Sequence, residues 1–182
     1  MSRYLSLLLL VVVFVFQGCA TTLTKGADRR TQGTYIDDGY IEDTATERIK
    51  KKYEERVHIN VNSYNRKVLV TGEVESETVK NDITRIIEGV QNVTDIRNEL
   101  AVAPLSGLSA RSADTLTTSN VLFRLRDSGK DFFRAERVKV VTEHDVVYLI
   151  GLVTHAEADV AKDIASTSRG VKKVVPMFEF VD

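Results

Sequence analysis

The clearest pattern in the chain is an alternation of apolar and polar residues over 57–62, which is the period of a strand with one buried face. After a polar turn the alternation resumes over 67–74, so these two strands are expected to form an antiparallel hairpin. Over 75–87 the apolar residues are spaced by three or four positions, as in a helix with one buried face. A strand-rich segment at 93–102 closes the unit, and a further helix is predicted before the hairpin, at about 44–56.

The second half of the chain repeats this order of elements. Gly72, near the end of the second strand of the first copy, aligns with Gly151, and an amphipathic helix follows each glycine. The second copy has its helix, two strands, helix and last strand at about 119–133, 137–142, 146–153, 154–165 and 174–181. The predicted fold class is α+β, with two tandem αββαβ domains, each a three-stranded mixed sheet packed by two helices.

The repeat divides most of the chain into two domains, 43–102 and 118–182, joined by a linker over 103–117. The linker contains Pro, Gly and several small residues, a composition that is typical of an exposed connection. A domain of about 60 residues buries only a small core. We therefore expect the two domains to pack against each other.

The N-terminus carries a strongly apolar segment that belongs to neither domain. Residues 5–16 are apolar with one exception, and a helix of this length rises about 18 Å, well short of the roughly 30 Å hydrocarbon core of a bilayer. Residues 1–18 are therefore predicted to be a secretory signal peptide rather than a membrane span.

Cys19 is the only cysteine of the chain and directly follows this segment. Residues 16–20 resemble the lipobox of bacterial lipoproteins, in which the cysteine receives the lipid and becomes the new N-terminus. The alternative is a plain secreted protein with a leftover thiol, which is a liability in an oxidising compartment. Residue 20 is Ala rather than Asp, which by the sorting rule of enteric lipoproteins implies the outer membrane. Residues 19–42 are predicted to be the lipidated cysteine and a tether.

Composition and charge exclude several classes of function. The 182 residues include 25 Lys+Arg and 26 Asp+Glu, for a net charge of −1, and 43% are hydrophobic, which argues against a nucleic-acid partner and against disorder. The sequence has no nucleophile-elbow, phosphate-loop or dinucleotide motif. His58, His144 and His155 stand in three different contexts without metal-ligand spacing, and a solvated turn is expected at His144. We predict no catalytic residue, no metal site and no cofactor.

The repeat resembles the BON domain of bacterial periplasmic proteins of the osmotically inducible type. The resemblance rests on the strand that ends in Gly-x-Val, the amphipathic helix and the Gly-Val pair before the last strand, and it covers about 43–181. Two such domains behind a lipobox look like the dual-BON outer-membrane lipoproteins. The resemblance implies an αββαβ unit, no enzyme activity, and a role in binding phospholipid surfaces and maintaining the cell envelope.

The first helix of the second domain carries the candidate functional residues. Val121 and Leu125 lie on its core-facing side, whereas Phe123 falls on the far side, beside Arg126 and, if the helix continues past Gly129, beside Lys130. Residues 111–139 hold seven Lys/Arg against four Asp/Glu. An exposed aromatic ring flanked by cations favours an anionic bilayer surface. The predicted lipid-binding residues are Phe123, Arg124, Arg126, Lys130 and Arg134.

Two interpretations of this helix stay open from the sequence. In the first, the second domain binds anionic phospholipid and the chain is a non-enzymatic, periplasm-facing outer-membrane lipoprotein that supports envelope integrity. In the other, Phe123 packs against the first domain and the arginines form a solvated face. The alternative function is a protein–protein module that docks on an outer-membrane assembly machine, through the same residues or through an exposed edge strand.

Overall fold

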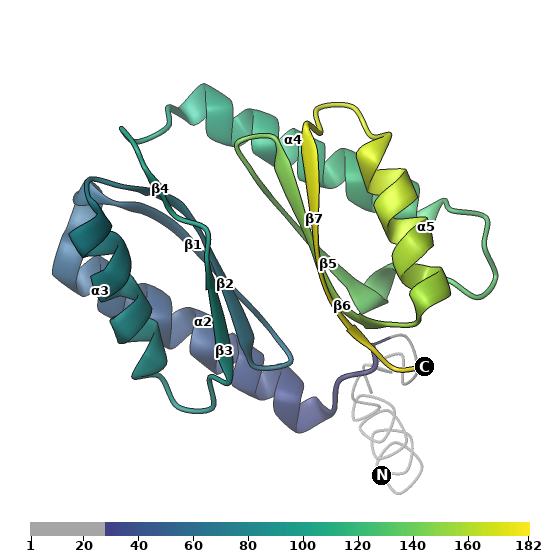
Figure 1. Cartoon of the computed structure of the whole chain (residues 1–182), viewed down its shortest axis with the longest axis horizontal. Helices are drawn as coiled ribbons and strands as arrows, with labels where there is room; N and C mark the ends of the chain where they lie inside the picture. The colour runs from purple at the N-terminus through teal and green to yellow at the C-terminus, as the bar shows by residue number, and fades with distance from the viewer. Residues whose placement is uncertain (1–27) are drawn as a thin grey trace, which may run out of the picture.

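The computed structural model describes residues 28–182, so the predicted signal peptide and Cys19 lie outside the described residues. The described chain forms two domains of the same plan, each with a sheet that is covered on one side by helices (Figure 1). The two sheets face each other and the helices lie on the outside (Figure 1). The layers therefore follow the order helices, sheet, sheet, helices.

The first domain contains a long helix, a hairpin, a second helix and a split third strand. Its elements are α2 (Gln32–Tyr53), η1 (Glu54–Arg56), β1 (His58–Tyr64), β2 (Lys67–Val74), α3 (Glu77–Glu88), β3 (Asp95–Asn98) and β4 (Ala101–Val102). β1 pairs antiparallel with β2, and both β3 and β4 pair with β2 in parallel. Together β3 and β4 form the single closing strand that the sequence predicts.

The second domain repeats this topology with an unbroken last strand. Its elements are α4 (Leu108–Arg126), η2 (Ala135–Arg137), β5 (Val138–Glu143), β6 (Val146–Val153), α5 (His155–Ser166) and β7 (Lys173–Phe180). β5 pairs antiparallel with β6, and β7 pairs with β6 in parallel. The predicted fold class is confirmed: both domains are αββαβ units with a mixed sheet and two covering helices.

Three apolar clusters hold the layers together. One fills the space between the first sheet and its helices, and a second does the same in the second domain. The third lies between the two sheets and contains Tyr64 and Leu69 of the first domain with Val141, Tyr148 and Ile150 of the second. Both faces of each sheet are therefore used, one for the domain's own core and one for the contact between domains.

The first helix of each domain is longer than the sequence pattern predicts. α2 begins at Gln32 rather than near 44, and α4 begins at Leu108 rather than near 119. The predicted tether is therefore wrong over 32–42, and the linker between the domains is correspondingly shorter than 103–117. The reason is that the buried face of each helix starts with polar residues, which interrupt the apolar spacing. These residues are Thr34 and Asp38 in α2, and Asp114 and Thr117 in α4.

The two aspartates among them hold the hairpin of their own domain. Asp38 accepts hydrogen bonds from the backbone N–H groups of Asn65 and Arg66 at 2.9 and 2.7 Å. Asp114 accepts two bonds of 3.0 Å from the corresponding amides at 144–145. All four turn residues have positive φ, between 51° and 65°, and none of them is glycine. Each helix thus stabilises a strained tight turn through a buried carboxylate.

The aligned glycines, Gly72 and Gly151, stand where the backbone beside the first strand of each hairpin leaves no room for a Cβ. A Cβ on Gly72 would lie 2.0 Å from the carbonyl oxygen of His58, and one on Gly151 would lie 2.3 Å from that of Arg137. Gly72 also has a φ of +124°, which L side chains rarely adopt. The repeated glycine is therefore a steric requirement of the hairpin.

Candidate membrane-binding surface

The C-terminal end of α4 exposes an apolar side chain to solvent. Phe123 is 67% exposed, so it does not pack against the first domain. Leu116, two helical turns earlier, is 71% exposed on the same side of the helix, and Phe132 in the following loop is 52% exposed. Sequence reasoning missed Leu116 and Phe132, although the seven-residue spacing between Leu116 and Phe123 was a signal for a shared face.

Exposed cationic side chains lie at the end of α4 and in the loop after it, but not all where the sequence predicts. α4 ends at Arg126, so Lys130 stands in the loop after the helix rather than on it. Arg126, Lys130 and Arg134 are exposed and line a pocket of about 290 Å³, together with the acidic Asp131 and Glu136. Arg134 also donates to the backbone oxygens of the loop at 131 and 133, at 2.7 and 3.0 Å.

Arg124 has a structural contact inside the second domain. Its guanidinium donates to the carbonyl oxygen of Ile164 at 2.8 Å, to Oγ of Ser168 at 2.7 Å and to Oγ1 of Thr167 at 3.1 Å. These groups belong to the end of α5, where carbonyl oxygens lack helical partners. Arg124 therefore ties α4 to α5, and the structure separates it from the exposed cations.

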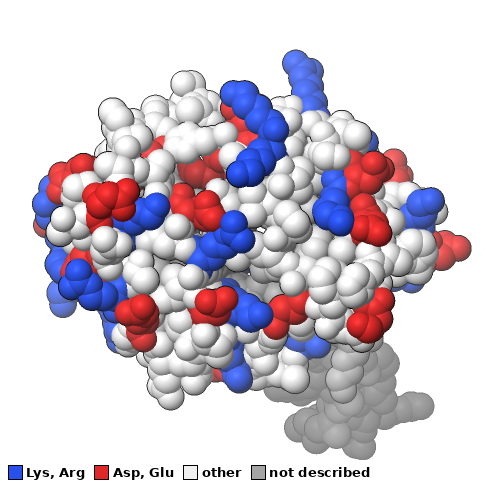
Figure 2. Space-filling model, viewed as in Figure 1, with Lys and Arg blue, Asp and Glu red and all other residues white. Residues whose placement is uncertain are grey.

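We call the exposed group on this side of the second domain the α4 surface. It consists of Leu116, Phe123, Arg126, Lys130, Phe132 and Arg134. Elsewhere the charges are mixed: Lys and Arg alternate with Asp and Glu over the face of both domains in Figure 2. Attraction to an anionic surface must therefore come from a local excess of cations rather than from the charge of the whole molecule.

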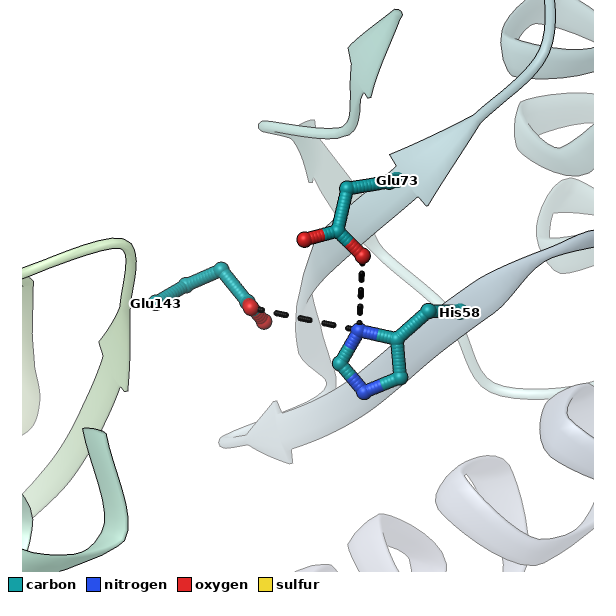
Figure 3. Close-up of side chains that lie close together, drawn as sticks. All are labelled: His58, Glu73 and Glu143. Atoms are coloured by element: carbon teal, nitrogen blue, oxygen red, sulfur yellow. Dashed lines mark hydrogen bonds and ion pairs between the residues drawn. The ribbon is translucent and has the colours of Figure 1, made fainter. Parts of the chain in front are cut away.

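Among residues 28–182, one group of side chains has the geometry to hold a metal ion: His58, Glu73 and Glu143. The three side chains come from both domains and point toward one another (Figure 3). Sequence reasoning missed this group because its members are far apart in the chain and only the packing of the two sheets brings them together.

Comparisons with known proteins identify the family. The BON domain model matches twice, at 37–104 and 113–182, and so covers both domains. The chain is 35% identical to "Outer membrane lipoprotein DolP" of Haemophilus influenzae, over 99% of this chain and 97% of that protein. It is 32% identical to the "21 kDa hemolysin" of Actinobacillus pleuropneumoniae, over 87% of this chain and 81% of that one. It is 33% identical to "Osmotically-inducible protein Y" of Escherichia coli, over 64% of this chain and 58% of that protein.

The fold and these matches define the class of protein: a chain with two tandem BON domains. The chain belongs to the BON domain family and is an outer-membrane lipoprotein with two BON domains. The predicted family and localisation are thereby confirmed. In the described part of the chain, no helix is long and apolar enough to cross a membrane.

Proposed function

We propose that the chain is anchored by a lipid on Cys19 and that its second domain makes an additional contact with anionic phospholipid through the α4 surface. The proposal is supported above all by Phe123, an aromatic ring that is 67% exposed one helical turn before the exposed Arg126. Large apolar side chains that stand in water at the end of a helix favour an interfacial environment. The role proposed for the protein is non-enzymatic support of the envelope.

The expected contact is weak by itself. Each Lys or Arg near an anionic surface contributes about 1 kcal/mol, and the three cations of the α4 surface are partly offset by Asp131 and Glu136. Phe123, Leu116 and Phe132 add the partitioning of apolar area. Such a contact orients a protein that the lipid anchor already holds at the membrane.

The pocket beside the end of α4 supports the proposal because cations line it. Its three cations surround a space of about 290 Å³ that opens to solvent, which suits the phosphate of a lipid head group. Arg126 comes from the end of α4 and Lys130 from the loop, so the pocket depends on the position of the loop relative to the helix.

Flotation with lipid vesicles tests the proposal. The protein is the full mature chain with Cys19→Ser, because a fragment that starts at 43 would remove Asp38 and part of α2. We expect binding to vesicles that contain phosphatidylglycerol, weaker binding at high salt, and none to neutral vesicles. Absence of binding to either vesicle would overturn the proposal and favour the alternative, a protein-docking module.

A pair of double variants locates the contact. Phe123→Ala with Lys130→Glu is expected to lower partition into anionic vesicles about tenfold or more. The matched control is Tyr40→Ala with Lys51→Glu, which removes an exposed ring and reverses an exposed charge on α2. Equal binding by both double variants would show that the α4 surface is not the contact.

A further inference from the structure

A polar cluster lies beside the apolar residues that pack between the two sheets. His58 lies at the start of β1 and Glu73 near the end of β2, both in the first domain. Glu143 ends β5 in the second domain, and His144 follows it in the turn. The side chain of Glu73 is fully buried and that of Glu143 is 6% exposed, while His58 is 16% exposed.

The side chains of His58, Glu73 and Glu143 converge between the domains (Figure 3). Nδ1 of His58 lies 2.9 Å from Oε2 of Glu73 and 4.0 Å from Oε1 of Glu143. Nε2 of His144 lies 2.6 Å from Oε1 of Glu73. This last contact lacks hydrogen-bond geometry, so Oε1 of Glu73 accepts no directional hydrogen bond from the described residues. A buried carboxylate oxygen that accepts no hydrogen bond is uncommon in folded proteins.

Two neighbours hold the Glu143 carboxylate in place. Nδ2 of Asn60 donates to its Oε2 at 2.9 Å, and Oγ1 of Thr71 donates to the same oxygen at 3.0 Å. The other oxygen, Oε1, is left on the side of His58. Metal-binding carboxylates are commonly oriented by such outer hydrogen bonds.

The charge of the cluster favours a cation. The side chain of Glu73 is fully buried and that of Glu143 nearly so. Two buried carboxylates need compensating positive charge. A divalent cation between the two carboxylates would supply that charge.

A path from solvent reaches the cluster. A pocket of about 280 Å³ is lined by His58, Glu143 and Arg111. Arg111 donates to Oγ of Ser106 at 3.2 Å and adds one positive charge near the site. The two buried carboxylates outweigh that single charge.

We propose that His58, Glu73 and Glu143, with His144 as a fourth ligand, bind a divalent transition-metal ion of the Zn²⁺ type between the two BON domains. Imidazole nitrogen and carboxylate oxygen are preferred ligands of Zn²⁺. The ligand atoms of the first three residues all lie within 4.8 Å of one another. Tetrahedral ligands at about 2.0–2.2 Å from the ion stand roughly 3.4 Å apart, so these three side chains would adjust their spacing around the ion, and Nε2 of His144 would join them from its place beside Glu73.

The ion would link the domains, because two ligands come from the first domain and two from the second. A bound ion would therefore resist separation of the two sheets and fix the α4 surface relative to the anchored N-terminal part of the chain. Binding to the folded state alone also raises stability by mass action.

Calorimetric titration with zinc sulfate tests the proposal. The protein is the full mature chain with Cys19→Ser, made without a histidine tag and treated with a chelator. We expect one Zn²⁺ per chain, a higher unfolding temperature with Zn²⁺ than with chelator, and no comparable effect of Mg²⁺. No saturable binding at micromolar Zn²⁺ would overturn the proposal.

Matched variants separate this site from other surface groups. Glu143→Gln keeps the shape of the side chain and is expected to lower Zn²⁺ affinity at least tenfold; His58→Gln is expected to do the same. The control is His155→Gln, because His155 pairs with Asp182 at the surface, outside the cluster. If His58→Gln fails to fold, Glu143→Gln decides alone, and wild-type affinity in that variant would contradict the proposed ligand set.

Discussion

The first helices of the two domains are buried at the same aligned positions, but they carry different residues at an exposed position. Asp38, Ile41, Ala45 and Ile49 of α2 correspond to Asp114, Thr117, Val121 and Leu125 of α4, and all eight are buried. On the outside the same alignment places Glu47 where α4 has Phe123, and both side chains are exposed. The repeat therefore preserves the framework of a hairpin and its covering helix, while the solvent-facing side is free to differ in function.

The end of each helix strengthens this contrast. In α2, Nζ of Lys52 pairs with Asp82 of α3 at 2.6 Å, and the hydroxyl of Tyr53 donates to the same carboxylate at 2.7 Å. In α4, Phe123 and Arg126 face solvent. Both helix ends make internal contacts, through Lys52 and Tyr53 in α2 and through Arg124 in α4, but the end of α4 also exposes the aromatic ring of Phe123.

The largest expected effect comes from the glycine that both domains share. Gly72→Ala places a Cβ 2.0 Å from the carbonyl oxygen of His58 at a φ of +124°, so it is expected to lower the free energy of unfolding by about 4 kcal/mol or more. Gly151→Ala meets the same kind of clash at 2.3 Å without the positive φ and is expected to cost less. Urea unfolding measures both. Gly39→Ala, where a Cβ meets nothing within 4 Å, is the control, and equal stability of all three variants would contradict the steric argument.

The second helices differ in their response to acid. Val79 in the first turn of α3 corresponds to Glu157 in α5, which completes a capping box with Thr154. Burial alone would raise the pKa of Glu157, but hydrogen bonds from Arg29, the Thr154 amide and Arg137 lower it to about 2. Because the folded-state pKa lies below the ordinary value of 4.5, this stabilisation is present above pH 4.5 and is lost as the pH falls toward 2.

The expected contribution of Glu157 at neutral pH is about 3 kcal/mol. Glu157→Gln is therefore expected to lower stability at pH 7 and to flatten its dependence on pH between 4.5 and 2. Urea unfolding across that pH range is the measurement, and Glu77→Gln in the first turn of α3 is the control. An unchanged acid profile in Glu157→Gln would mean that this ion pair contributes nothing.

The two hairpin-holding aspartates are expected to differ moderately. Asp38 accepts from two turn amides and from Oγ of Ser63 at 2.6 Å, and it pairs with Arg30 at 2.9 Å, whereas Asp114 accepts from the two amides of its own turn. Asp38→Ala is expected to cost about 3 kcal/mol and Asp114→Ala about 2 kcal/mol. Thermal or urea unfolding checks both values. A larger loss of stability in Asp114→Ala than in Asp38→Ala would contradict the inference that the first hairpin is held more tightly.

One substitution makes the second domain like the first at an exposed position. It is expected to have the smallest effect on stability and a clear effect on vesicle binding. Phe123→Glu introduces the residue type of Glu47 and is expected to change unfolding by less than about 0.5 kcal/mol. It is expected to lower partition into anionic vesicles about tenfold, because it removes apolar area and adds repulsion. Flotation and urea unfolding on the same preparation separate the two effects. Undiminished vesicle binding would place the lipid contact elsewhere in the chain.

The candidate membrane surface was predictable only in part. The period of α4 predicts that Phe123 lies opposite the core, since that follows from 100° per residue. The position of Lys130 was not predictable, because the helix ends at Arg126 before reaching it. The role of Arg124 was equally hidden, since its partners lie at the end of α5, some forty residues later.

The sequence by itself determined the repeat, the order of strands and helices and the family, because these depend on local periodicity and on a glycine that must recur. Only the tertiary structure decided where α2 and α4 begin, since Asp38 and Asp114 are polar residues that become buried by bonding a distant turn. Likewise, only the packing of one sheet on the other brings Glu143 to His58. Local pattern reports which face of an element is apolar, but long-range contacts between polar groups depend on how the elements are assembled.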